Sequence, residues 1–439
     1  MVELFGSGLI SFWLDAAGVR FGSQEALELL TLQSGSAVVL PAIDSVGLTV
    51  MEQYFQNLES RGLERVNQGI WIQSGPVLLA NNNGTVPLPA ASLTKIATSL
   101  VALKTWGPKH RFQTLISATG PIVNGVLQGD LVVTGGGDPF FVWEEAIALG
   151  NTLNSLGIDR VSGNLVIAGN FAMNYESDPY LAGELLKQGL DSTTWKRAGN
   201  VQYLQLPPNT PRPHVAIAGS VQVASIPNPK QILLLRHHSL PLSQILKEMN
   251  IYSNNEMSEM VAQLLGGAQV VQQQAATAAM VPQSEIQLMN GSGLGVENRI
   301  SPRAACAMFM VLQRELMRYQ MNVADLFPVA GYDRRGTLEA RHLPSGAAIK
   351  TGTLNEVSAL AGVLPTRDRG LIWFAIVNRG WDIERLRASQ DQLLQRLVMH
   401  WHLPQVPPSA LTPHPSSRTP TGLGAASRNE ILYNLNAKR

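Results

Sequence analysis

The sequence has 439 residues, more than a single hydrophobic core normally organises, so we expect two domains or one domain interrupted by an insertion. Hydrophobic residues make up 45% of the chain and charged residues 15%, a composition typical of a globular protein. The formal net charge is only +1 and no run of Lys and Arg stands out, which excludes the basic surface of a nucleic-acid-binding protein.

The beginning of the chain gives no clear membrane signal. No run of about 20 apolar residues occurs, so no conventional spanning helix is expected. The segment Leu4–Ala17 is apolar but short, and it lacks a basic start and a clear cleavage site. We interpret it either as an N-terminal structural segment or as an atypical anchor or export signal, which leaves membrane contact open.

Helix and strand patterns alternate over the first hundred residues. Residues 47–66 carry apolar side chains at helical spacing and predict an amphipathic helix. Two strand-like runs, Gly69–Gln73 and Pro76–Ala80, predict a hairpin. The segment Ser92–Trp106 predicts a second helix that begins at a serine.

The middle of the chain has a different residue pattern. Residues 112–235 contain short β-rich runs separated by Gly and Pro, and we interpret them as an inserted, mostly β accessory domain. Helical spacing returns in Leu240–Met249 and Met257–Leu265. Residues 250–256 are then the connection between two helices.

Strand patterns dominate the last part of the predicted body. Residues 347–353, 359–365 and 371–377 predict an antiparallel sheet, and a long amphipathic helix follows at 382–401. The fold class is therefore α+β, with an antiparallel sheet flanked by helices.

These patterns predict the following domain organisation. Residues 20–111 and 236–402 form one discontinuous domain around the insertion. Residues 403–439 begin with a stretch rich in Pro, Ser and Thr, and they are predicted to be a linker or a disordered tail.

The first candidate for chemistry is Ser92-Leu93-Thr94-Lys95. Positions i and i+3 of a helix lie on one face, so the serine hydroxyl and the lysine amine are neighbours. A lysine in a poorly solvated pocket loses proton affinity and can accept the hydroxyl proton as the serine attacks a carbonyl. Taken alone, the pattern is more often a helix-capping serine followed by a solvated lysine.

The second candidate is Lys350-Thr351-Gly352-Thr353 on a predicted strand. A lysine and two threonine hydroxyls can hold a substrate carboxylate, and a glycine permits close approach of a backbone. The N–H groups of Ser92 and Thr353 could together stabilise an oxyanion. The alternative is an exposed edge lysine that discourages strand pairing.

The third candidate is Ser253-Asn254-Asn255, in the connection between two predicted helices. A hydroxyl there can relay a proton to a leaving amine, and an amide can hold a substrate backbone. Two other S-x-N matches begin at Ser162 and Ser427, and we favour Ser253 from its context and its place in the motif order.

The same stretch can also be read in a second register. Tyr252-Ser253-Asn254 forms a Y-x-N motif, in which Tyr252 and Asn254 would be the active pair. The sequence leaves this alternative open.

The order S-x-x-K, S-x-N, K-T-G resembles that of penicillin-binding proteins and serine β-lactamases. The 161 positions from Ser92 to Ser253 are similar to the long gap of the class C low-molecular-mass D-alanyl-D-alanine carboxypeptidases and endopeptidases, and they argue against class A β-lactamases. The resemblance covers roughly Val50 to His402. It implies a penicillin-binding transpeptidase and β-lactamase-like body.

The resemblance also implies an activity and roles for the site residues. Ser92 would be acylated by a peptidoglycan stem peptide ending in D-Ala-D-Ala, or by a β-lactam antibiotic, with Lys95 as the base and Ser253 as the proton shuttle. Asn255 would anchor the substrate amide. Lys350, Thr351 and Thr353 would clamp the carboxylate, next to Gly352. No metal or organic cofactor is needed, and a periplasmic or cell-envelope location follows from the substrate.

The D-alanyl-D-alanine carboxypeptidase or endopeptidase function has two alternatives, a serine β-lactamase and a peptidoglycan-binding module. A serine β-lactamase differs mainly in how fast water clears the acyl-enzyme, and a peptidoglycan-binding module would have lost turnover altogether. The motifs also do not separate carboxypeptidase from endopeptidase action.

Overall fold

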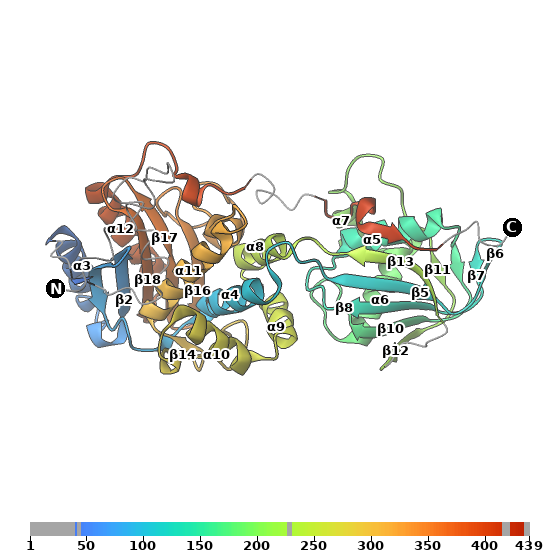
Figure 1. Ribbon diagram of the computed structural model, residues 1–439, viewed down its shortest axis with the longest axis horizontal. Helices are drawn as coiled ribbons and strands as arrows, with labels where there is room; N and C mark the ends of the chain where they lie inside the picture. Colours follow the sequence, from blue (N-terminus) through green and yellow to red (C-terminus); the bar gives the residue numbers. More distant parts are fainter. Residues whose placement is uncertain (1–39, 42–44, 226–230, 415–421, 434–439) are drawn as a thin grey trace, which may run out of the picture.

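The computed structural model describes residues 40–41, 45–225, 231–414 and 422–433. The chain forms two lobes that lie side by side along the long axis of the molecule (Figure 1). The segment Leu4–Ala17 lies outside the described residues. Within the described residues, no helix is both long and apolar enough to cross a membrane.

The larger lobe is built on a six-stranded sheet. Its order across the sheet is β1 (Leu40–Pro41), β3 (Val77–Asn82), β2 (Gly69–Ser74), β18 (Gly370–Arg379), β17 (Val357–Thr366) and β16 (Ala348–Leu354). All neighbours pair antiparallel except β1 and β3. The predicted hairpin and the three late strands are therefore confirmed, and β16 is an edge strand.

One face of this sheet packs against two helices from opposite ends of the chain. They are α3 (Ser45–Glu59) and α12 (Ile383–Trp401). Tyr54 and Phe55 of α3 and Leu394 of α12 join Phe374 of β18 in one buried cluster. Both helices were expected, although α3 ends seven residues before the predicted limit because the chain turns at Gly62.

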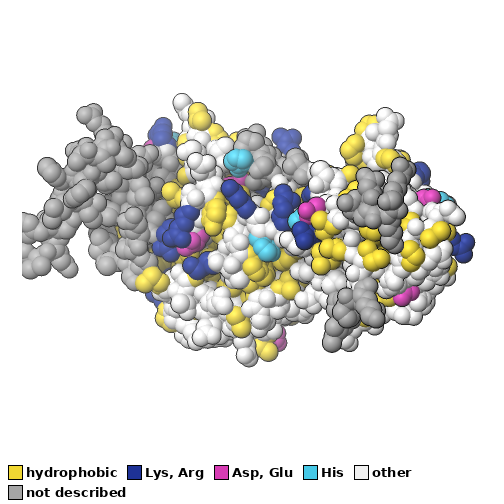
Figure 2. Space-filling view, turned by 45° about the vertical axis from the view of Figure 1, so that its right-hand side comes forward, with side chains coloured by type: hydrophobic (Ala, Val, Ile, Leu, Met, Phe, Trp, Pro, Cys, Tyr) yellow, Lys and Arg dark blue, Asp and Glu magenta, His cyan; other side chains and the backbone are white. Residues whose placement is uncertain are grey.

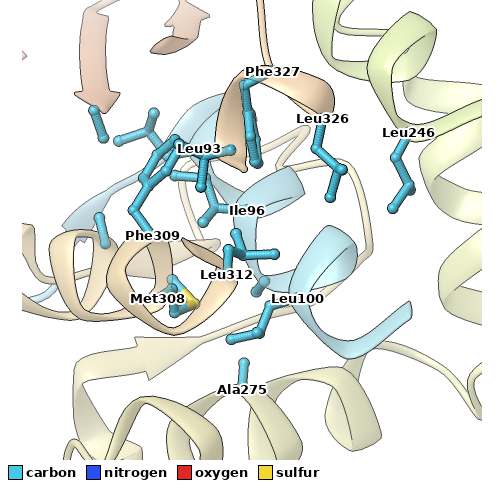
Figure 3. Packing of buried hydrophobic residues seen from close by; sticks show 14 of the residues in the cluster. Leu93, Ile96, Leu100, Leu246, Ala275, Met308, Phe309, Leu312, Leu326 and Phe327 are labelled. Atoms are coloured by element: carbon cyan, nitrogen blue, oxygen red, sulfur yellow. The ribbon is translucent and has the colours of Figure 1, made fainter. Parts of the chain in front are cut away.

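The other face of the sheet is covered by a helical layer. It contains α4 (Thr94–Trp106), α8 (Leu242–Tyr252), α9 (Asn255–Leu264), α10 (Ala268–Ala279) and α11 (Pro302–Met317). Helix α4 lies at the centre of this layer, and every residue from Thr94 to Leu103 is buried. Figure 3 shows Ile96 and Leu100 of α4 packed close to Phe309 and Leu312 of α11. The helix that follows Ser92 is thus enclosed by other elements, which fixes its first turn in place.

The smaller lobe, the accessory lobe, contains a second six-stranded sheet. Its order is β12 (Val221–Ala224), β10 (Leu165–Asn170), β8 (Leu131–Gly136), β5 (Gln113–Ala118), β13 (Ile232–His238) and β19 (Asn429–Ile431). A small sheet of two-residue strands lies beside it: β6 (Ile122–Val123), β7 (Val126–Leu127), β9 (Arg160–Val161) and β11 (Ala216–Ile217).

The prediction of a mostly β accessory domain is wrong. Strands β8, β10 and β12 are parallel neighbours, and parallel strands require long crossovers, which are usually helical. Helices α5 (Trp143–Ser155) and α6 (Pro179–Leu190) belong to these crossovers, and α7 (Arg197–Tyr203) follows them. The lobe is therefore a mixed α/β unit.

The prediction of a disordered tail is also wrong for the described part of residues 403–439. Leu411 is buried in the core of the larger lobe, and β19 pairs antiparallel with β13 in the accessory lobe. Because the partners lie about 200 residues away, local composition carries no sign of this pairing. Residues 415–421 and 434–439 lie outside the described residues.

No single charge dominates the described residues on the face shown in Figure 2. On the face shown in Figure 2, Lys and Arg side chains form several separate groups among acidic, apolar and uncharged atoms.

Candidate active site

Ser92 lies at the entrance to the central helix of the larger lobe. A short 3-10 turn, Ala91–Leu93, leads directly into α4. Ala91 has a φ of +48°, a conformation that costs a non-glycine residue energy and is enriched at functional sites. One helical turn further on, the Nζ atom of Lys95 lies 3.1 Å from the Ser92 Oγ atom. The predicted pairing of hydroxyl and amine on one helix face is present.

Lys95 is completely buried and is held by three polar partners. Besides Ser92, its Nζ atom contacts the Asn255 Oδ1 atom at 2.8 Å and the Ser292 carbonyl oxygen at 2.9 Å. Burial lowers the pKa of Lys95 to about 7, although the charges of Glu259 and Glu256 oppose this shift. A large fraction of Lys95 is therefore neutral at neutral pH and able to accept a proton.

Ser253 lies opposite this pair, between α8 and α9. It ends α8 in the left-handed conformation, with a φ of +54°. The buried Lys350 Nζ atom, from the edge strand β16, donates a hydrogen bond of 2.9 Å to the Ser253 Oγ atom. Burial, and the nearby charge of Lys95, lower the pKa of Lys350 well below its ordinary value. The site thus contains two serine–lysine pairs.

The structure distinguishes the two registers of the third motif. Asn254 caps α9 by accepting the Met257 N–H, so its side chain serves the helix. Tyr252 is 52% exposed, and its hydroxyl accepts a hydrogen bond from Arg335. Ser253 and Asn255, in contrast, contact the two lysines.

The edge strand β16 brings the last motif against Ser92. A Cβ atom added at Gly352 would lie 2.9 Å from the Ala90 carbonyl oxygen and 3.1 Å from the Ser92 nitrogen. The glycine is thus required by contact with the serine segment itself. Side chains alternate along a strand, so Thr351 and Thr353 lie on the face of β16 opposite to that of Gly352.

The two other S-x-N matches lie elsewhere. Ser162 accepts a hydrogen bond from Gly129 N–H within the accessory lobe, and Ser427 lies in the short turn Ala426–Arg428 that precedes β19. The structure does not bring either of them to Ser92.

A cavity of about 510 Å³ opens between the accessory lobe and helix α9. Helix α9 begins with Asn255, and its later residues Met260, Gln263 and Leu264 form one wall of the cavity. Asp138 and Phe171 of the accessory lobe are among the residues of the other wall. The accessory lobe and the helix that begins with Asn255 therefore line one cavity together.

Comparison with known proteins identifies the family. Residues 54–180 and 212–399 match the model of the D-Ala-D-Ala carboxypeptidase 3 (S13) family, which is well over half of the chain. The chain belongs to this family. It is accordingly a D-Ala-D-Ala carboxypeptidase of the hydrolase class, as the motif order implied.

Curated relatives are consistent with this membership. The chain is 26% identical over 340 residues to carboxypeptidase Rv3627c of Mycobacterium tuberculosis, covering 67% of this chain and 71% of that protein. It is 22% identical over 393 residues to D-alanyl-D-alanine carboxypeptidase DacB of Haemophilus influenzae, covering 67% and 80%.

Solved structures share the fold. Bd3459, a predatory peptidoglycan endopeptidase from Bdellovibrio bacteriovorus, aligns with a TM-score of 0.64 at 20% identity over 83% of this chain and 98% of that one. Penicillin-binding protein 4 (dacB) from Haemophilus influenzae aligns with a TM-score of 0.59 at 18% identity, covering 80% and 99%. The predicted α+β penicillin-binding fold is confirmed.

One residue of this S13 site was missed in the sequence. The carboxylate of Glu259 accepts the backbone N–H groups of Gly291 and Ser292, both at 2.9 Å. It thereby holds the turn whose Ser292 carbonyl contacts Lys95, and its charge favours protonated Lys95. Glu259 lies four positions after Asn255, on the same helix face, and that spacing is a signal that could have indicated it.

Proposed function

We propose that this carboxypeptidase removes the terminal D-alanine of peptidoglycan stem peptides through an acyl-enzyme on Ser92. The observation that carries the proposal is the buried Lys95 amine, 3.1 Å from the Ser92 hydroxyl and with a pKa lowered to about 7. A serine hydroxyl is a weak nucleophile by itself, and a neutral amine at hydrogen-bonding distance is the base that it needs.

Acylation begins with a proton transfer. Neutral Lys95 takes the Ser92 proton while the Oγ atom attacks the carbonyl carbon of the penultimate D-alanine. The oxyanion forms beside the N–H groups of Ser92 and Thr353, which lie on the two segments that meet at Gly352. Asn255 holds the substrate amide.

Collapse of the intermediate breaks the C–N bond and requires a proton on the leaving amine. Ser253 relays the proton that Lys95 took from Ser92: its hydroxyl donates a proton to the amine and regains one from Lys95. The neighbouring Lys350, 2.9 Å from the Ser253 oxygen, stabilises the transfer. Thr351 and Thr353, on the same strand as Lys350, hold the terminal carboxylate. Water then attacks the ester carbonyl and gives one proton to Lys95. The bond between the acyl group and the Ser92 Oγ atom breaks, and Lys95 returns that proton to Ser92.

β-Lactams act on the same serine in this proposal. One structural neighbour is described as a penicillin G-acylated form of Bd3459, which supports β-lactams as ligands here. Family members act on the bacterial cell wall, so we place the enzyme in the periplasm or cell envelope, where its substrate lies.

Release of D-alanine from a synthetic stem pentapeptide ending in D-Ala-D-Ala tests this function. We expect steady release by the wild type and none above background by Ser92→Ala, because the nucleophile is lost. A cross-linked muropeptide assayed in parallel separates endopeptidase from carboxypeptidase action.

Other outcomes would support the alternatives. Rapid hydrolysis of benzylpenicillin without D-alanine release would favour a β-lactamase. A folded wild-type protein that binds peptidoglycan but releases nothing would favour a binding module.

A further inference from the structure

An arginine from the last helix lies at the carboxylate end of the site. Arg387 of α12 donates a hydrogen bond of 2.8 Å from its Nη2 atom to the Thr353 Oγ1 atom. Thr353 is exposed and follows Gly352, which lies against the Ser92 nitrogen. The guanidinium is therefore next to the side chain that we propose to contact the substrate carboxylate.

The arginine retains donors for a ligand. Its Nη1 atom contacts the Glu384 Oε1 atom at 2.7 Å, one helical turn earlier. These two bonds use two of the five N–H donors of a guanidinium, and the side chain is 31% exposed. Glu384 is 78% exposed and orients the guanidinium from the solvent side.

The lysine of the K-T-G motif is poorly suited to supply the charge at this position. Its Nζ atom is buried and bonded to both the Ser253 hydroxyl and the Thr351 carbonyl oxygen. Burial and the charge of Lys95 also lower the pKa of Lys350, so the free enzyme does not favour two ammonium groups side by side. A guanidinium stays charged and has a fork geometry that suits a carboxylate.

We propose that Arg387 is a specificity-determining residue that pairs with the free α-carboxylate of the leaving residue, which is D-alanine in the carboxypeptidase reaction. This inference rests on the proposed function. It assigns the positive charge of the carboxylate subsite to α12, an element that carries none of the three motifs.

Two substrates that differ only at the C-terminus test this role. One is a stem pentapeptide with a free carboxylate, and the other is the same peptide with a C-terminal amide. We expect Arg387→Gln to lower kcat/KM for the carboxylate peptide about tenfold to a hundredfold, the value of a charge-assisted hydrogen bond. For the amide peptide we expect kcat/KM to change by less than about threefold, because this peptide has no carboxylate with which the Arg387 guanidinium could pair.

Arg385→Gln is the matched control. Arg385 lies two positions earlier on the same helix, is 73% exposed and pairs with Asp382. The Arg385→Gln substitution also removes one positive charge from α12, but on another side of the helix. The ratio of kcat/KM between the two substrates should therefore stay at the wild-type value.

The possible results separate the explanations. An equal loss for both substrates with Arg387→Gln would mean that the arginine only supports β16, and no loss would mean that it does not contact the carboxylate; either overturns the inference. Hydrolysis of neither peptide by the wild type would overturn the proposed function, and this inference with it.

Discussion

Lys95→Met is expected to slow acylation of Ser92 by about a thousandfold, within the range of roughly 10² to 10⁴ for loss of a general base. Methionine fills the buried space of the lysine stem but cannot accept the serine proton. Stopped-flow measurement of benzylpenicillin acylation checks this result, and circular dichroism confirms that the variant is folded.

The pH dependence of the same reaction follows from the state of Lys95. Its pKa is lowered to about 7, and only the neutral amine accepts the proton. The wild-type acylation rate should therefore rise with pH through about 7 and then level off. A rate in Lys95→Met within threefold of the wild type, or a wild-type rate that falls over this range, would contradict the role of Lys95 as the base.

Arg428→Met is expected to destabilise the accessory lobe by about 3 to 5 kcal/mol, the usual cost of removing one partner of a buried ion pair. Arg428 is paired with the buried Glu145 of α5 and also donates to the Gly422 and His238 carbonyl oxygens. Differential scanning calorimetry should show that the variant unfolds at a lower temperature than the wild type. The loss of stability relative to the wild type should be larger at pH 8 than at pH 5.

The pH difference has a defined sign. Burial raises the pKa of Glu145 to about 7 even with Arg428 beside it. Removing the cation raises this pKa further, so at pH 5 the carboxyl is neutral and tolerates burial, whereas at pH 8 it must remain buried as an unpaired charge or bind a proton unfavourably.

Arg236→Met provides the control for the C-terminal strand. Arg236 on β13 pairs with Glu430 on β19, and both side chains are substantially exposed. We expect a change below about 1 kcal/mol, as for other surface ion pairs. An effect of Arg428→Met no larger than this would contradict the idea that the C-terminal segment stabilises the accessory lobe.

The parts of the fold that depend on local pattern could be predicted from the sequence. Ser92 and Lys95 meet because helical spacing alone brings positions i and i+3 together. The hairpin and the three late strands follow from short runs with clear turns between them. The parallel crossovers of the accessory lobe were missed because α5 and α6 lie among short strand-like runs that dominate the pattern.

The rest depends on contacts between distant segments. The motif register was ambiguous because the sequence does not reveal the left-handed backbone of Ser253 or the capping role of Asn254. Arg428 and Glu145 lie 283 positions apart, and strands β17 and β18 lie between Thr353 and Arg387 in the sequence. No local spacing encodes such pairs.

Mass spectrometry of the intact protein with benzylpenicillin, followed by peptide mapping, shows whether Ser92 forms the acyl-enzyme. We expect a single covalent adduct on the peptide that contains Ser92, and no adduct in Ser92→Ala. A folded wild-type protein that forms no adduct over hours and does not consume the drug, or one that carries the adduct on another residue, would contradict it.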